Sequence, residues 1–139
     1  MRLWHIGLIP YLPRKQLISQ WRECCCIAKN IKEKGSPNHL LVNKIMEYPE
    51  EDFNYYADAV ASEMIKRGYR VYNWKFYQYR NDIQHLPVEK VFKSWHTKRY
   101  AKICMANLLE KYSCYGMSTT EWAELLAGYK KVFREEFVL

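Results

Sequence analysis

The chain has 139 residues, of which 49% are hydrophobic and 16% aromatic. That length fits one domain, and the apolar content suffices for a packed core, which argues against a disordered chain. No apolar run approaches the roughly 18 residues that a membrane span needs, and we expect no membrane partner and a cytoplasmic location. The formal net charge of +7 favours an anionic partner, most often nucleic acid. A basic surface that only confers solubility is the alternative.

Five cysteines are present, and three of them are consecutive at residues 24–26. The odd count argues against a disulfide framework. Three consecutive helical residues point about 100° apart, so they cannot converge on one metal ion. Neither a Cys-x-x-Cys pair nor a set of cysteines and histidines at zinc spacing occurs. We therefore predict free, mostly buried thiols and no metal.

The first elements in chain order are an arm and a long helix. Residues 3–12 are apolar and aromatic, but a glycine and a proline interrupt them, which predicts an irregular N-terminal arm on the core. The chain then enters a helix through Pro13, apolar residues recur at three- and four-residue steps, and Gly35 ends the helix. A short second helix is predicted over residues 39–47.

The clearest helix spans residues 50–67. Its first turn is acidic and its last turn basic, which is the arrangement that the helix dipole favours, and Gly68 follows as a stop. Residues 69–80 mix aromatic and basic side chains without strict alternation, so we predict a structured loop there rather than a strand.

The C-terminal part continues the helical pattern. The segment Pro87–Lys93 is predicted to form a short helical turn, and a further helix is predicted over residues 96–112. Residues 118–121 (Ser-Thr-Thr-Glu) form a capping box for a last helix that ends near Glu136. The sequence thus predicts an all-α fold: one compact domain over residues 1–139, built as a bundle of about five helices with an irregular N-terminal arm and an aromatic loop.

The loop over residues 69–80 has a composition that suits nucleic acid. Lysine and arginine contact phosphates, and exposed aromatic rings stack on bases. A tyrosine-rich loop that packs on the core is equally compatible with this composition. The basic residues are Arg70, Lys75 and Arg80, and the aromatic residues are Tyr69, Tyr72, Trp74, Phe76, Tyr77 and Tyr79.

Motifs of several enzyme classes are absent, among them the serine-nucleophile, P-loop and dinucleotide-binding motifs. The four histidines are isolated in sequence, which favours structural roles for most of them. Taken alone, the adjacent Arg22 and Glu23 are typical of a solvated helix face. Composition and spacing therefore indicate a basic α-helical domain that binds nucleic acid.

A set of short segments in a fixed order carries a more specific signal. The segments are Arg2, then Gln16 to Glu23 (QLISQWRE), then Lys66-Arg67-Gly68-Tyr69, and more weakly the stretch from His96 through Lys111 and Tyr115-Gly116. This order resembles the pyrimidine-dimer DNA glycosylase/AP lyases of the bacteriophage endonuclease V type. The resemblance spans residues 1–116, and residues 117–139 form an additional C-terminal helix outside it.

The resemblance implies a covalent mechanism without a metal or an organic cofactor. The N-terminal α-amine attacks C1′ of the damaged nucleotide, an imine forms as the base leaves, and β-elimination cuts the strand. An α-amine suits this role because part of it is neutral at physiological pH. Met1 would supply the amine, and Glu23 would stabilise the cationic sugar or imine and move protons. Arg2 and Arg22 would hold phosphates around the lesion.

Three positions depart from the family pattern. The family nucleophile is a threonine amine that is exposed when Met is removed, whereas Arg2 is too bulky for ordinary Met excision, so the amine of Met1 itself would react. A family histidine is replaced by Gln16, and a family arginine is replaced by Cys26. Lys15 and His5 are candidates to substitute for the lost DNA contacts.

We therefore predict a DNA repair glycosylase with AP-lyase activity that excises pyrimidine dimers or a related damaged or modified base from double-stranded DNA and acts as a monomer. A non-catalytic nucleic-acid-binding helical module is one alternative. A protein-interaction domain whose last helix buries its apolar face in a partner is another. The predicted catalytic residues are Met1 and Glu23, and the predicted DNA-binding residues are Arg2, Arg22, Lys15, His5, Arg70, Lys75 and Arg80.

Overall fold

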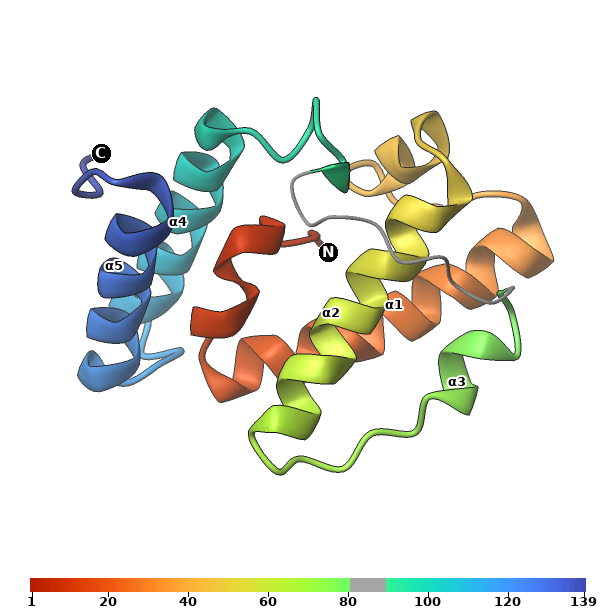
Figure 1. Ribbon diagram of the computed structural model, residues 1–139, viewed down its shortest axis with the longest axis horizontal. Helices are drawn as coiled ribbons and strands as arrows, with labels where there is room; N and C mark the ends of the chain where they lie inside the picture. Colours follow the sequence, from red (N-terminus) through yellow and green to blue (C-terminus); the bar gives the residue numbers. More distant parts are fainter. Residues whose placement is uncertain (81–89) are drawn as a thin grey trace.

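Every secondary-structure element among residues 1–80 and 90–139, the part of the chain that the computed structural model describes, is helical (Figure 1). This confirms the predicted all-α fold. None of the described helices combines the length and the hydropathy that a membrane-spanning segment needs. The elements are the 3-10 helices η1 (Ile6–Tyr11) and η2 (Asn43–Glu47) and the α-helices α1 (Arg14–Lys34), α2 (Glu50–Lys66), α3 (Trp74–Tyr77), α4 (Lys98–Ser113) and α5 (Thr119–Phe133).

Helices α1 and α2 begin and end where the sequence signals predict. Helix α1 starts directly after Pro13. At its end Gly35 takes the left-handed conformation with φ of 80°, and its N–H donates to the Ile31 carbonyl oxygen at 3.0 Å. Gly68 follows α2 with φ of 82°. Glycine adopts this conformation without the steric cost that a β-carbon brings, so both helices stop there.

Helix α5 belongs to the same hydrophobic core as the rest of the chain. The predicted capping box is confirmed, because Ser118 and Glu121 each accept a hydrogen bond from the other's backbone N–H. Leu125 and Tyr129 on this helix are fully buried. The apolar face of the last helix is therefore used inside the chain, which removes the basis for an interaction domain that would bury it in a partner.

The N-terminal segment is more regular than predicted. Residues 6–11 form η1 instead of an irregular arm, and His5 caps it because its Nδ1 accepts a hydrogen bond from the Gly7 N–H at 2.9 Å. Leu3 and Leu8 in this segment are fully buried. The segment is therefore part of the core rather than a strap on its surface.

Two further predicted segments differ from the structure. The predicted helix over 39–47 is reduced to the 3-10 helix η2, and both Leu40 and Leu41, expected on its apolar face, are exposed. The predicted loop over 69–80 contains the short helix α3. The predicted turn Pro87–Lys93 begins outside the described residues.

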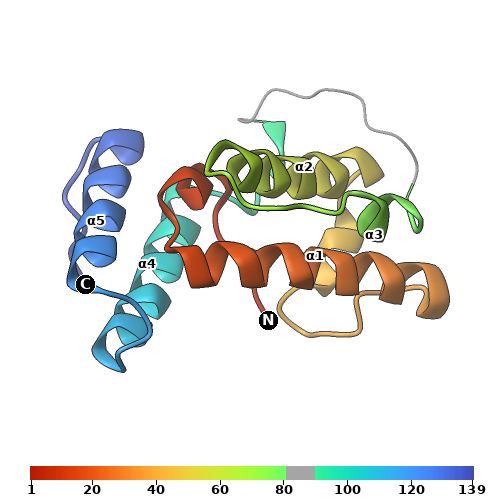
Figure 2. The same ribbon diagram turned by 90° about the horizontal axis from the view of Figure 1, so that it is seen from below.

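The helix η1 joins two helical pairs. It packs against α2 and against α5, while α1 packs against α2 and α3 and α4 packs against α5. Figure 1 shows the N-terminal segment between the α4–α5 pair and the α1–α2 pair, and Figure 2 shows α1 and α2 running alongside each other. Contact with α5 is close, because a β-carbon on Gly128 would lie 2.1 Å from the Tyr11 ring.

An arginine at the end of α2 fixes the far end of η1. The Arg67 guanidinium donates to the carbonyl oxygens of Leu12 at 2.7 Å and Pro10 at 3.0 Å, and it pairs with Glu63 at 2.8 Å. These carbonyls lie at a helix end, where they have no partner within the helix. The Lys-Arg-Gly-Tyr segment therefore connects α2 to the N-terminal unit that carries Met1.

Candidate active site

A pocket of about 220 Å³ contains both the first residue and the carboxylate of α1. Its walls come from the N-terminal segment, from α1, from the loop that precedes η2, and from α4. Met1 and Glu23, which the family resemblance pairs as amine and carboxylate, therefore line the same concavity. The lining residues are Met1, Arg2, Trp4, Glu23, Leu41, Asn107 and Lys111.

The Glu23 carboxyl group is partly buried and experiences opposing influences. Burial raises its pKa, whereas the positive charge of the N-terminal ammonium lowers it, as do the Arg2 backbone, the Lys111 ammonium and the Gln20 side chain. Burial dominates, so the pKa of Glu23 lies above its ordinary value. A carboxyl group with a raised pKa exchanges protons more readily near neutral pH, which suits general acid–base chemistry.

A buried polar network holds the N-terminal backbone against α1 and α2. Gln20 is fully buried, and its Oε1 accepts a hydrogen bond from the Trp4 N–H at 2.8 Å. The Tyr56 hydroxyl on α2 lies 2.6 Å from the Trp4 carbonyl oxygen and 2.9 Å from Gln20 Oε1, and it donates toward both. Buried polar groups that are satisfied in this way fix one backbone position. The network therefore sets where Met1 and Arg2 enter the pocket.

Arg2 is half-buried and connects the pocket to α4. It lines the pocket, and its guanidinium interacts with the hydroxyl of Tyr100. That hydroxyl donates to the Leu3 carbonyl oxygen at 2.6 Å. Arg2 therefore has a protein contact on one side and faces the pocket on the other.

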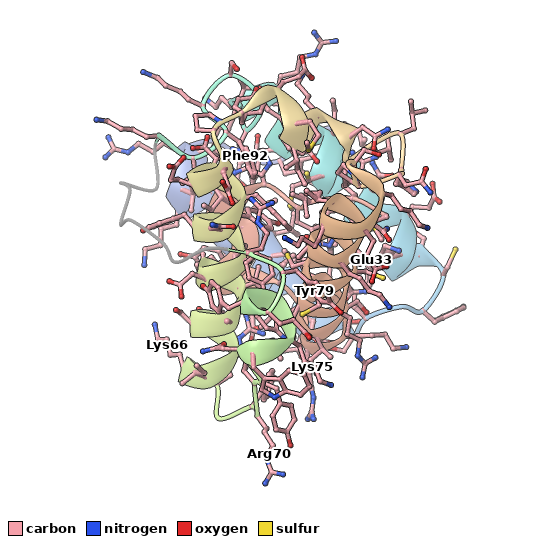
Figure 3. The ribbon with its side chains drawn as sticks, turned by 90° about the vertical axis from the view of Figure 1, so that its right-hand side faces the viewer. Glu33, Lys66, Arg70, Lys75, Tyr79 and Phe92 are labelled. Atoms are coloured by element: carbon pink, nitrogen blue, oxygen red, sulfur yellow. The ribbon has the colours of Figure 1, made fainter. Side chains whose placement is uncertain are left out.

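Two further pockets adjoin α1 and share Arg22. One of about 730 Å³ lies between α1 and the turn that joins α4 to α5, and Lys15 lines it. The other, of about 330 Å³, is lined by Arg22 together with Arg70 and Lys75. Figure 3 shows Arg70 and Lys75 at the same end of the molecule, next to α3. The structure thus brings four of the predicted DNA-binding residues together along α1.

Exposed aromatic rings accompany these cations. Tyr72 is 46% exposed and Trp74 is 61% exposed. The Lys75 ammonium lies 5.4 Å from the centre of the Tyr72 ring and 5.9 Å from the centre of the Trp74 ring. A surface of cations and exposed rings is typical of proteins that bind unpaired bases.

His5 does not lie on this surface, and the prediction that it contacts DNA is wrong. The ring is buried, its Nε2 donates to the His96 carbonyl oxygen at 2.8 Å, and its Nδ1 accepts from the Gly7 N–H. Burial lowers the pKa of His5 to about 4. A neutral ring with both nitrogen atoms used inside the core is unavailable to a phosphate.

Arg80 is also occupied within the protein. Its Nε donates to Asn54 Oδ1 at 2.8 Å, its Nη2 donates to the Glu50 carbonyl oxygen at 3.2 Å, and its guanidinium lies over the Phe53 ring. These contacts tie the end of the aromatic segment to the start of α2. We therefore assign Arg80 a structural role in place of the predicted DNA contact.

Several residues at the pocket escaped the sequence analysis as site residues. Gln20 carries a local signal, because it lies three residues before Glu23 on the same helix. Asn107 and Lys111 are four residues apart on α4 and so share a face, but nothing in the sequence connects that face to α1. Within the described residues, no three His, Cys, Asp or Glu side chains converge to hold a metal ion.

Comparison with known proteins gives one match. The model of a family described as pyrimidine dimer DNA glycosylase matches residues 1–76. That range includes the N-terminal segment, α1, α2 and the four cations along α1, whereas Asn107, Lys111 and helix α5 lie outside it. No curated protein and no solved structure matches the chain.

Proposed function

The chain belongs to the pyrimidine dimer DNA glycosylase family, and from this premise we propose that it is a glycosylase with AP-lyase activity whose nucleophile is the Met1 amine. The single observation that carries the proposal is that Met1 and Glu23 line one pocket. The substrate is double-stranded DNA that contains a pyrimidine dimer or a related damaged base. The protein acts as a monomer and uses its own amine and carboxylate for the chemistry.

The first step forms one bond and breaks another. The lone pair of the neutral Met1 amine attacks C1′, and the bond from C1′ to the damaged base breaks with its electron pair leaving on the base. The Glu23 carboxylate then takes a proton from the substituted amine, and the nitrogen lone pair expels O4′ to open the sugar ring and form an imine. Borohydride reduces this imine, which makes the intermediate detectable.

Glu23 has two tasks in the later steps. In its acid form it gives a proton to O4′ as the ring opens. The resulting carboxylate then takes a proton from C2′, and the electrons of that C–H bond expel the 3′ phosphate in β-elimination. The raised pKa of Glu23 supports this alternation between acid and base, and its negative charge stabilises the iminium ion.

The duplex is held by the basic pockets along α1. Arg22, Arg70, Lys75 and Lys15 are exposed and line adjoining pockets. Their guanidinium and ammonium groups contact phosphates on either side of the lesion. Arg2 contacts the phosphate nearest the reacting sugar, since it lines the pocket of Met1 and Glu23.

The test is borohydride trapping on a duplex with a single abasic site, followed by assays on duplexes with defined lesions. Wild-type protein is expected to form a covalent adduct at Met1, identified by mass spectrometry of the peptide. An N-terminal extension moves the amine out of the pocket, and Glu23→Gln removes the proton carrier, so each is expected to abolish trapping and with it strand cleavage.

A matched control is Glu33→Gln on the exposed part of the same helix (Figure 3). It makes the same chemical change away from the pocket and is expected to leave trapping unchanged. Trapping that persists after the N-terminus is extended would reject the amine mechanism and point to a lysine. Salt-dependent DNA binding without trapping or cleavage would point instead to a non-catalytic binding module.

A further inference from the structure

The N-terminal amine contacts a histidine that neither composition nor resemblance singles out. The Met1 nitrogen lies 3.4 Å from His39 Nε2. We propose that His39 is a positioning residue whose neutral imidazole accepts a hydrogen bond from the amine and aims it at the reacting sugar. This inference rests on the proposed amine mechanism and names the group that orients its nucleophile.

The protonation states fix the direction of this hydrogen bond. The ammonium group has donors but no acceptor, and the neutral amine must keep its lone pair free to attack C1′, so in either form the amine donates and His39 presents a bare Nε2 to it. A neutral imidazole then carries its one N–H on Nδ1. Nδ1 is buried and has no hydrogen-bond partner among the described residues. Within that part of the chain the ring therefore makes its polar contact with the amine alone, although burying an unpaired nitrogen is costly.

The backbone around His39 is fixed on both sides, so the ring is well placed. The His39 N–H donates to Asn43 Oδ1 at 3.0 Å, and its carbonyl oxygen accepts from the N–H groups of Val42 and Asn43 at 3.1 and 2.9 Å. Val42 is fully buried and anchors this turn in the core. The preceding residue, Asn38, takes the left-handed conformation with φ of 59°. Asparagine tolerates that conformation better than most residues.

The amine therefore has two polar side chains near it, Glu23 and His39. Glu23 reaches the pocket from α1, and the ammonium charge partly offsets the rise that burial causes in the pKa of Glu23. His39 approaches from the loop before η2, and Leu41, two residues later, lines the same pocket. A terminal amine rotates freely unless something holds it, and attack on C1′ requires its lone pair to point along one direction. Restricting that rotation raises the rate without adding affinity for DNA.

Three substitutions separate a hydrogen-bond role from a packing role. In His39→Gln, the amide oxygen lies as many bonds from Cβ as Nε2 does, so it can accept from the amine. In His39→Asn, the amide oxygen corresponds to Nδ1 and cannot reach. His39→Leu has no acceptor. The measurements are the borohydride trapping rate at saturating abasic-site duplex and the Kd for a duplex with a reduced abasic site.

We expect His39→Gln to trap within about threefold of the wild-type rate, and the Asn and Leu variants to lose about tenfold or more. The Kd of all three is expected to be unchanged. The inference is overturned if the Asn and Leu variants trap at the wild-type rate, or if the Gln variant is as slow as the Leu variant while circular dichroism shows native folding.

The same experiment separates this inference from the proposed function. A wild-type adduct at Met1 together with unchanged His39 variants rejects the role of His39 and leaves the amine mechanism intact. A wild-type adduct at any other residue, or none, rejects the amine mechanism and the role of His39 with it. Peptide mass spectrometry of the trapped wild-type complex decides between these results.

Discussion

The buried side-chain amide of Gln20 donates a hydrogen bond to a carboxylate oxygen of Glu23 at 3.1 Å. The same nitrogen donates to the Arg2 carbonyl oxygen at 3.0 Å. One side chain thus holds both the carboxylate and the backbone next to the amine. The separation of the two proposed reacting groups therefore depends on Gln20, whose side chain is fully buried.

Replacing Gln20 is expected to impair both stability and trapping. Gln20→Leu leaves the buried Trp4 N–H without an acceptor and the Arg2 carbonyl oxygen without its donor. We expect the free energy of unfolding to fall by about 2–4 kcal/mol. Trapping should slow about tenfold or more, because the amine and Glu23 are no longer held together. Urea unfolding and borohydride trapping at saturating DNA measure the two effects.

Gln20→Glu serves as the shape-matched control. It keeps an acceptor for the Trp4 N–H but removes the donor to Arg2 and adds a second carboxylate beside Glu23. We expect it to trap slowly even where it remains folded, since like charges disfavour two adjacent carboxylates. A Gln20→Leu protein that traps at the wild-type rate would show that this contact does not position the site.

Lys75 and Arg80 are expected to differ in their effect on the salt dependence of DNA binding. Lys75 is exposed beside Arg70, whereas Arg80 is bonded to Asn54 and Glu50. Lys75→Gln should reduce the slope of log Kd against log salt by about 1 and leave thermal stability unchanged. Arg80→Gln should leave the slope unchanged and lower stability by about 1–3 kcal/mol. Fluorescence anisotropy at four salt concentrations measures the slope, and thermal unfolding measures the stability. A smaller slope for Arg80→Gln together with an unchanged slope for Lys75→Gln would refute the assignment of Lys75 to DNA binding and of Arg80 to the fold.

Acid is expected to destabilise the fold through the buried histidines. Burial lowers the pKa of His5 from 6.5 to about 4, so below pH 6.5 the unfolded chain takes up a proton that the folded chain does not. The contribution of His5 to the free energy of unfolding is therefore complete above pH 6.5, and it falls by about 3 kcal/mol as the pH drops to 4. Burial also lowers the pKa of His96, which acts in the same direction. Urea unfolding at pH 7.5, 6 and 5 measures the loss.

A variant without the His5 titration provides the comparison. In His5→Asn, the amide oxygen still accepts from the Gly7 N–H, but the side chain no longer titrates. Its stability is expected to change less steeply between pH 6.5 and 4, whatever its absolute value at neutral pH. An equally steep dependence in both proteins would assign the acid sensitivity to other groups.

The elements that the sequence predicts well are those with local signals. Pro13 and Gly35 bound α1, and the Ser118 capping box starts α5, because these residues act within one helical turn. The helix η1 lacks such a signal. Its conformation depends on contacts with α2 and α5 and on Arg67, which are distant in the chain. Sequence periodicity cannot report contacts of that kind.

The candidate site likewise depends on contacts between residues that are distant in the sequence, and these could not be predicted from local signals. Arg22 and Glu23 attract attention only through the resemblance, since by themselves they are typical of a solvated helix face. The contact between Met1 and His39 joins the N-terminus to the loop before η2, and no spacing in the sequence predicts it. The burial of His5 was missed because an isolated histidine in an apolar stretch is compatible with either a core or a surface position.

A glycine inside α5 gives a sharp test of how η1 is packed. Alanine usually stabilises a helix by about 1 kcal/mol relative to glycine. At Gly128, however, a β-carbon would lie 2.1 Å from the Tyr11 ring. We therefore expect Gly128→Ala to lower the free energy of unfolding by about 1–3 kcal/mol, because the ring must move out of a packed position. Urea unfolding at pH 7.5 measures the change.

Removing the ring is expected to reverse the sign of this effect. In the background of Tyr11→Ala the added methyl group meets no ring, so Gly128→Ala should become neutral or stabilising by up to about 1 kcal/mol. The double-mutant cycle isolates the interaction between the two positions from the cost of each change. If Gly128→Ala stabilises the protein with Tyr11 in place, then η1 does not pack on α5 in solution as it does here. Helix α5 could then support the N-terminal segment only indirectly, through its contacts with α4.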